Sequence, residues 1–308
     1  MSILKVIHLE NNEVEINDQL SVALGYFDGL HRGHQAVINE AVTYAKQNGM
    51  KSAVLTFSPN PNVVLKKLTS ELLLTPYQEK VRLLTEMGVD YLFILAFNEV
   101  TASIKAREFI QTYLIDLNVR HVSTGFDFRF GQRGEGSVEL LRAYQDEFTL
   151  NVTEKCGIED EKIGATQIKS YLAVGDVKKA AEMLGRPYML TGTVITGQQK
   201  GRQIGFPTAN LGLTEAFVVP KNGVYAVKVW VDEGSYIGMC NVGHNPTFNF
   251  IDQVSIEVNI LDFNQDIYGK EIKIEFYERL RDEQRFSSIQ ELMAQLDSDR
   301  ETVRRYFK

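Results

Sequence analysis

The chain contains few cysteines and no apolar run long enough to cross a membrane. Its two cysteines, Cys156 and Cys240, lie far apart and form no Cys-x-x-Cys pair. This spacing argues against a cysteine-ligated zinc site and fits a reducing compartment, so we expect a cytoplasmic protein. The most apolar run, residues 92–97, is far shorter than a membrane span, and charged residues interrupt the N-terminal sequence too early for a signal peptide.

Positive charge is also scarce. Lysine and arginine total 33 against 40 aspartates and glutamates, which gives a formal charge of −7. This balance argues against a general nucleic-acid binder or a membrane-surface protein, and an anionic substrate would need a local group of cations or a metal. With 308 residues, 44% of them hydrophobic, the chain can fill more than one core, so we expect two globular domains.

Apolar strands alternate with helical patterns in the first half of the chain. Runs at 52–57, 90–97 and 119–124 are apolar throughout, and helical spacing of apolar residues separates them. Such strands indicate a parallel sheet that is covered on both faces. The Thr75-Pro76-Tyr77-Gln78 sequence predicts a helix that starts with a capping box and a proline at its first position.

A glycine-rich polar turn follows the first apolar strand and precedes a helix. Gly25, Gly29 and Gly33 surround Asp28, His31, Arg32 and His34 in this turn. Glycine lets a ligand approach the backbone, and a helix N-terminus attracts anions. A lone histidine at a helix start is more often a cap, but two histidines among three glycines favour a phosphate site.

A second polar turn, residues 125–131, follows the strand at 119–124. It combines aromatic residues with Asp127 and Arg129, a mixture that suits a ring and a phosphate, although Asp127 could simply cap the turn. Ligands bind beyond the carboxyl ends of parallel strands, which is where both turns are expected to lie.

The second half of the chain has the two-residue period of β-strands. Runs at 224–231, 235–242, 254–261 and 271–277 predict an antiparallel sheet, most simply a small barrel. Ser287 and Ser288 then predict the start of a C-terminal helix. We expect its apolar stripe to be core that packs on the barrel; the stripe consists of Ile289, Leu292, Met293 and Leu296.

The chemistry of the second half centres on residues 201–210. Gly201 and Gly205 permit close backbone approach to phosphates before Pro207, while the Thr208 hydroxyl and the Asn210 side-chain oxygen are hard ligands suited to Mg²⁺. Read alone, the segment could be a rigid loop. Glu257 lies on the polar face of its strand, where most glutamates are simply solvated.

Two sets of motifs carry a family resemblance. Residues 25–34, with their His-x-Gly-His ending, resemble the signature of the nucleotidyltransferase superfamily. Together with 125–131 they resemble the adenylyltransferase half of the prokaryotic bifunctional riboflavin kinase/FAD synthetase family. Gly-Phe-Pro-Thr-Ala-Asn at 205–210 closely resembles the flavokinase signature, and 241–248, 256–263, 268–269 and 279–281 continue the resemblance in order.

The resemblance implies an α/β chain with two domains. Residues 1–186 would form a Rossmann-like nucleotidyltransferase domain with a parallel sheet, and 187–308 a small antiparallel β-barrel with a C-terminal helix. The substrates would be riboflavin, FMN and ATP, with Mg²⁺ accompanying ATP. Neither nucleic acid nor a membrane is expected as a partner, and the oligomeric state is open.

The resemblance also implies roles for individual residues. His31 and His34 would contact the ATP phosphates and stabilise the charge that builds during adenylyl transfer. Glu257 would be the general base that takes the proton of the ribityl hydroxyl. The other residues that it assigns to binding are Gly25, Phe27, Asp28, Gly33, Asp127, Thr166 and Lys169 for the first ATP, Gly201, Gly205, Pro207, Thr208 and Asn210 for the second ATP and its Mg²⁺, and Arg281 for the flavin.

The segment 164–169 departs from the family pattern Ser-Ser-Thr-x-x-Arg. Thr166 is kept, but Gly164 and Ala165 lack hydroxyls and Lys169 replaces the bidentate arginine fork with a point charge. A riboflavin kinase with weak or absent FAD synthesis is therefore one alternative. A non-catalytic flavin-binding regulator and an adenylyltransferase for another phosphate ester are two more. Asn259 stands where relatives often carry histidine, and we expect a modest effect there.

Overall fold

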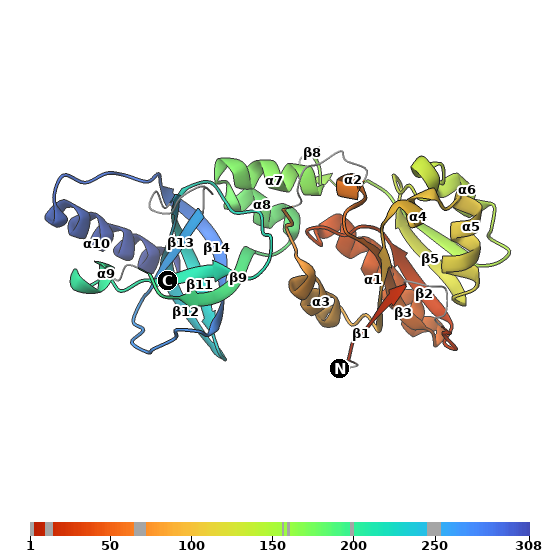
Figure 1. Ribbon diagram of the computed structural model, residues 1–308, viewed down its shortest axis with the longest axis horizontal. Helices are drawn as coiled ribbons and strands as arrows, with labels where there is room; N and C mark the ends of the chain where they lie inside the picture. The colour runs from red at the N-terminus through yellow and green to blue at the C-terminus, as the bar shows by residue number, and fades with distance from the viewer. Residues whose placement is uncertain are drawn as a thin grey trace. The chain divides into compact units, whose positions relative to one another are not determined.

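The structure, a computed structural model, describes residues 3–9, 15–64, 72–155, 157–158, 161–197, 200–244 and 254–308 (Figure 1). It divides into two compact units, Met1–Gly164 and Ala165–Lys308. The structure therefore divides after Gly164, so that residues 165–184 fall in the second unit. The domain boundary after residue 186 that the sequence suggested stays a prediction. Asn245-Pro246-Thr247-Phe248, part of the flavokinase resemblance, lies outside the described residues.

The first unit is built on a six-stranded sheet in the order β1-β4-β3-β2-β5-β6. Every pairing in it is parallel, as expected from strands that are apolar on both faces. Its strands are β1 (Lys5–Leu9), β2 (Leu20–Leu24), β3 (Lys51–Ser58), β4 (Tyr91–Ala96), β5 (Val119–Gly125) and β6 (Thr149–Thr153).

The helices of the first unit are α1 (Arg32–Asn48), α2 (Pro61–Val64), α3 (Tyr77–Glu86), α4 (Glu99–Ser103), α5 (Ala106–Ile110) and α6 (Val138–Arg142), and a short pair of strands, β7 (Gly157–Ile158) and β8 (Glu161–Lys162), follows β6. Helices α1, α3, α5 and α6 contribute to two apolar clusters against this sheet. The sequence placed Pro76 at the first helical position, whereas in the structure Pro76 is the N-cap and α3 begins at Tyr77. Strand β2 lies between β3 and β5, so the chain reverses its winding direction there, and such a reversal opens a crevice at the carboxyl edge.

The second unit contains a closed six-stranded barrel in the order β10-β13-β12-β11-β14-β9. The alternating pattern predicted four of these strands and missed β9 and β10. The six are β9 (Tyr188–Ile195), β10 (Ala209–Leu213), β11 (Gly223–Val231), β12 (Gly234–His244), β13 (Val254–Ile260) and β14 (Glu271–Arg281). On β13, Ile256 and Val258 are buried and Glu257 between them is half-buried, so the carboxylate lies on the face opposite the barrel core.

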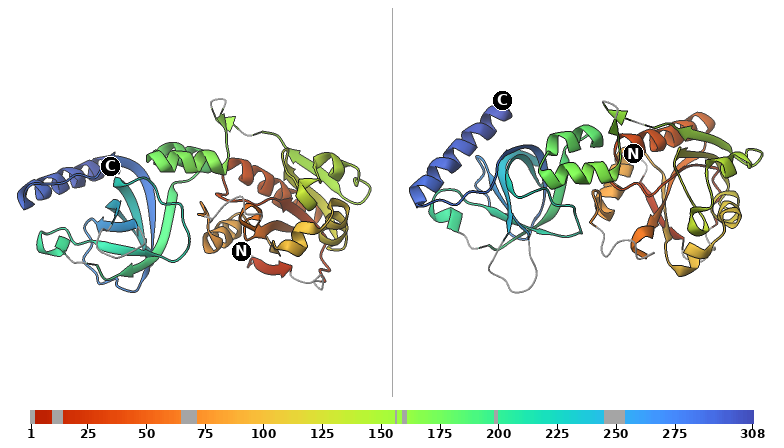
Figure 2. Two further views of the ribbon diagram at one scale, coloured as in Figure 1. Left: turned by 45° about the horizontal axis from the view of Figure 1, so that its top comes forward. Right: turned by 90° about the horizontal axis from the view of Figure 1, so that it is seen from above.

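In the described part of the second unit, four helices accompany the barrel. Helices α7 (Ala165–Val174) and α8 (Val177–Leu184) lie side by side, and α8 packs on β14 and β9; α9 (Lys200–Gln203) precedes β10 (Figures 1 and 2). Helix α10 (Ile289–Tyr306) begins at Ser288, whose hydroxyl accepts the amide of Glu291 as predicted.

The apolar stripe of α10 is core only in part, because Leu296 packs on the barrel cluster while other residues of the stripe are exposed. Ile289 is 60% exposed and Met293 37% exposed, whereas the buried residues of α10 are Asp299 and Val303. The C-terminal half of the helix packs on the barrel while its first turns extend beyond it (Figure 2). Two other residues of the stripe, Leu292 and Leu296, line the cavity described below.

Candidate active sites

The first candidate site is the turn between β2 and α1. His31 is the N-cap of α1, and its Nδ1 accepts the backbone N–H of His34 at 3.2 Å. The two imidazoles stack with centroids 3.5 Å apart, and Phe27 meets His34 edge-on at 5.2 Å. His31 is therefore a helix cap, and its expected contact with phosphates at this helix N-terminus stays a prediction.

The backbone of this turn is strained. Phe27 and Leu30 adopt positive φ angles of 56° and 42°, although both are buried and neither is glycine. A side chain at Gly25 would come within 2.8 Å of the Phe27 ring, so this position requires glycine. Strain of this kind is held by the surrounding structure and concentrates at functional sites.

His34 is held in its neutral form. Burial of the ring is the main cause that lowers its pKa well below the usual 6.5, and the nearby His31 and Lys80 act in the same direction. Within the described part of the chain, its buried Nδ1 has no hydrogen-bond partner. A neutral imidazole contributes hydrogen bonds rather than a net charge to a bound anion.

Asp28 and Lys80 connect this turn to residues 74–80 of the same unit. The Oδ1 of Asp28, which is 4% exposed, accepts the backbone N–H groups of Leu74 at 2.8 Å and Thr75 at 3.2 Å. The Nζ of Lys80, itself buried, donates to the carbonyl of Tyr26 at 3.1 Å. Asp28 thus anchors the segment before α3, and its expected part in nucleotide binding stays a prediction. The sequence analysis missed Lys80. The signal that could have identified it is its position within an apolar helical pattern.

The second polar turn lies beside the first. In the sheet, Leu24 of β2 pairs with Thr124 of β5, so the turns that leave these strands share one edge. Asp127 is exposed in the second turn, and Gly33 lies in the first turn of α1. Thr166 and Lys169 lie on α7, in the second unit, and their expected contact with phosphates stays a prediction.

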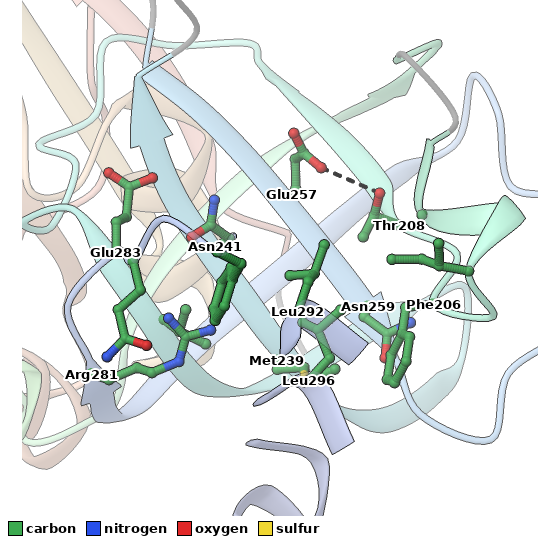
Figure 3. A pocket seen from close by; sticks show the side chains of 15 residues that line it. Phe206, Thr208, Met239, Asn241, Glu257, Asn259, Arg281, Glu283, Leu292 and Leu296 are labelled. Carbon is green, nitrogen blue, oxygen red and sulfur yellow. Dashed lines mark hydrogen bonds between the residues drawn. The ribbon is translucent and has the colours of Figure 1, made fainter. Parts of the chain in front are cut away.

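The second candidate site lies on the outside of the barrel, around Glu257 of β13. Its Oε2 accepts the hydroxyl of Thr208 at 3.3 Å (Figure 3). Its Oε1 accepts the hydroxyl of Ser255 at the same distance. Asn210 of β10 stands directly opposite Glu257 in the strand register. Three residues that the sequence singled out are therefore adjacent, and Ser255, which it did not, joins them.

The loop before β10 is fixed by its own backbone. The amide of Phe206 donates to the carbonyl of Gly201 at 2.9 Å, and Gly205 has a φ of 82° that favours glycine. The side-chain amide of Asn259 donates to the carbonyl of Pro207 at 2.7 Å. Asn259 therefore holds the loop that carries Thr208, a contact that sequence reasoning did not identify.

Two cavities meet at Thr208. The first, of about 320 Å³, has the Glu257 carboxylate at one side, Arg281 and Glu283 at another, and apolar walls (Figure 3). Those walls include Ile204, Phe206, Val224, Met239, Leu292 and Leu296. Arg281, which the sequence placed near a flavin, thus shares a cavity with Glu257, and the α10 stripe forms part of its lining.

The second cavity, of about 400 Å³, is more polar in its lining residues. It contains Arg202, Pro207 and Thr208 on one side and the segment 263–268, with Asp266 and Tyr268, on the other. Since Thr208 lines both cavities, a group bound in one can approach a group bound in the other next to the Glu257 carboxylate.

Two candidate phosphate-binding sites on two separate folds are typical of a transferase that combines two activities in one chain. The FAD synthetase family model matches residues 13–167, and the riboflavin kinase family model matches residues 184–307. The bifunctional riboflavin kinase/FMN adenylyltransferase of Bacillus subtilis is 42% identical, covering 99% of this chain and 98% of the relative. The Escherichia coli K12 enzyme of the same name is 36% identical over 93% and 92%. The chain belongs to the bifunctional riboflavin kinase/FMN adenylyltransferase family.

A solved structure has the same fold throughout. A chain from Streptococcus pneumoniae, described as a macrolide-efflux protein, superposes with a TM-score of 0.90 at 35% identity, over 97% of this chain and 98% of the other. Among the helices that the structure describes here, none is both long enough and apolar enough to cross a membrane. The expected fold class, a parallel nucleotidyltransferase sheet followed by a barrel with a C-terminal helix, is confirmed.

Domains of these two kinds use ATP with a divalent metal. Thr208 offers a hydroxyl oxygen, and Asn210, opposite Glu257 in the register, offers an amide oxygen. Hard oxygens next to a carboxylate are the ligand type that a divalent cation prefers, and the expected role of Thr208 and Asn210 as metal ligands stays a prediction.

Proposed function

We propose that the barrel transfers the γ-phosphoryl group of ATP to the terminal ribityl hydroxyl of riboflavin, giving FMN and ADP. The observation that carries this proposal is the position of Thr208, which lines both cavities and donates to Glu257. Glu257 accepts the proton of the attacking hydroxyl, the new O–P bond forms, and the bond to the β-phosphate oxygen breaks. Phosphoryl transfer depends mainly on positioning and charge stabilisation, which suits two cavities that meet at one hydroxyl.

The linings of the cavities favour one assignment of the substrates. The first cavity has apolar walls that match a tricyclic flavin ring, with Asn241 and Arg281 as polar partners for its carbonyl edge. The second cavity, with Arg202 and Tyr268, suits the nucleotide. Thr208 and Asn210 would hold Mg²⁺, which neutralises phosphate charge when it is bound.

The first unit would convert FMN to FAD with a second ATP. An oxygen of the FMN phosphate attacks the α-phosphorus of ATP, and diphosphate leaves. His34 and His31 lie at the start of α1, where imidazole N–H groups and the helix N-terminus stabilise the added charge at the α-phosphate. Because His34 is neutral, it acts as a hydrogen-bond donor rather than as a fixed cation.

A second candidate function, a riboflavin kinase with weak FAD synthesis, has a specific observation in its favour. Gly164, Ala165 and Lys169 remove two hydroxyls and an arginine fork from the expected phosphate-closing segment, which favours a riboflavin kinase with weak FAD synthesis. A non-catalytic flavin-binding regulator is disfavoured by the Thr208–Glu257 arrangement. A cytoplasmic location fits the substrates and the buried, unpaired thiol of Cys240.

A flavin time course tests these alternatives. The protein is incubated with riboflavin, ATP and Mg²⁺, and riboflavin, FMN and FAD are separated and quantified. FMN that rises first and is followed by FAD supports both activities. FMN without FAD supports the kinase alone, and bound but unchanged riboflavin would overturn the enzyme assignment.

A further inference from the structure

A buried ion pair joins the end of the barrel strand β14 to helix α10. The Nε and Nη2 of Arg281 donate to Oδ2 of Asp299 at 3.0 and 2.8 Å, and the side chains are 14% and 5% exposed. The side-chain amide of Gln295 donates to Asp299 Oδ1 at 2.8 Å. The Nε of Arg281 also donates to Oδ1 at 3.2 Å, so both carboxylate oxygens are engaged and the charged pair fixes the direction of the guanidinium as well as its distance.

The ion pair adjoins the lining of the first cavity. Arg281 lines that cavity, and its guanidinium lies 5.9 Å from the ring centre of Phe286, another lining residue. Asp299 is not one of the lining residues, but Leu292 and Leu296 on the preceding turns of its own helix are (Figure 3).

Helix α10 has few other buried anchors. Its first turns are largely exposed, and its buried side chains are Asp299 and Val303. Since Leu292 and Leu296 precede both anchors, Asp299 is the nearer one and restrains the turns that form the cavity wall. The apolar wall and the guanidinium are thus oriented by the same carboxylate.

We propose that Asp299 is a positioning residue for the flavin acceptor, acting through Arg281 and the Leu292–Leu296 wall without touching the substrate. This inference rests on the proposed placement of riboflavin in the first cavity. The reacting groups are Thr208, in the loop before β10, and Glu257 on β13, whereas the ion pair joins β14 to α10. Loss of the Asp299 charge should therefore weaken flavin binding and leave the phosphoryl-transfer step unchanged.

Asp299→Asn is the first test, because it keeps the size of the side chain and removes its charge. We expect the KM for riboflavin, and the Kd measured by flavin fluorescence, to rise about tenfold, since hydrogen bonds to charged groups are worth that much. The kcat at saturating riboflavin and the KM for ATP should stay unchanged, which also shows that the barrel is folded. Glu301→Gln removes the same charge from an exposed position on the same helix and should change neither constant. Asp299→Glu should restore part of the affinity.

Two further variants separate the role of Asp299 from the placement of the flavin. Gln295→Ala removes one bond to Asp299 and keeps the ion pair, so it tests the idea even if Asp299→Asn fails to fold; a riboflavin KM raised with kcat unchanged supports the proposal. Leu292→Trp fills the cavity, and an unchanged riboflavin KM for this variant would overturn the placement of the flavin itself. If Leu292→Trp raises the KM while Asp299→Asn and Gln295→Ala leave it unchanged, the role of Asp299 alone is overturned.

Discussion

The Thr208 hydroxyl lies 3.3 Å from Oε2 of Glu257 and lines both cavities of the barrel unit. The relationship joins a loop residue to the middle of a strand 49 positions later in the chain. Ser255 supports the other carboxylate oxygen, and Asn259 holds the loop that carries Thr208. The carboxylate is therefore oriented before any substrate arrives, which is what a general base in a phosphoryl transfer requires.

Replacing Glu257 by glutamine should separate the two activities. We expect riboflavin phosphorylation to fall by about 10²–10⁴, because the amide cannot accept the proton of the attacking hydroxyl. Conversion of FMN to FAD should remain nearly intact, since it depends on the first unit. Both rates are measured on the same preparation, with Glu271→Gln, an exposed glutamate of β14, as the matched control. Equal loss of both activities in Glu257→Gln would contradict the assignment of Glu257 to the kinase.

The sequence predicted the type of most elements because their apolar periods are strong. The strand–turn–helix around Gly25 and the Glu257 strand could be found from local pattern alone. The adjacency of Thr208 and Glu257 could not be derived from local pattern, since it arises from barrel closure between distant strands. The prediction that the α10 stripe is core holds for Leu296 and fails for the exposed Ile289 and Met293. An apolar helix face looks the same in the sequence whether it covers a core, lines a cavity or stays exposed.

Asn259→Ala tests whether Asn259 holds the loop that carries Thr208 in place. The variant loses the 2.7 Å bond to the Pro207 carbonyl, which costs about 0.5–1.5 kcal/mol for a neutral hydrogen bond. We expect kcat/KM for ATP in the kinase reaction to fall up to about tenfold, because the loop that carries Thr208 loses its fixed position. Steady-state kinetics at varied ATP measure this effect. An unchanged kcat/KM would show that the backbone bonds of the loop suffice.

The His34 imidazole should not titrate near pH 6.5. Its folded-state pKa is depressed, mainly by burial, so the folded chain stays neutral there while the unfolded chain takes up a proton. The stability that this residue contributes is therefore present above about pH 6.5 and is lost as the pH falls toward the folded pKa. NMR titration of the five histidines, with His34→Asn to assign the signal, measures the pKa. Protonation of His34 at or above pH 6.5 would contradict the neutral-donor role.

Lys169→Arg should raise FAD synthesis if the missing guanidinium fork limits the first unit. Arginine binds phosphate oxygens in a bidentate geometry, whereas lysine offers one point charge on a flexible stem. The variant keeps the charge and the helical position on α7, so we expect the KM for ATP in the FMN-to-FAD reaction to fall and the rate to rise several-fold. Riboflavin phosphorylation measured in the same preparation should not change, because Glu257 and Thr208 lie on other elements. An unchanged rate of FAD synthesis would show that the lysine, or another cation in its place, already meets the charge of the phosphates.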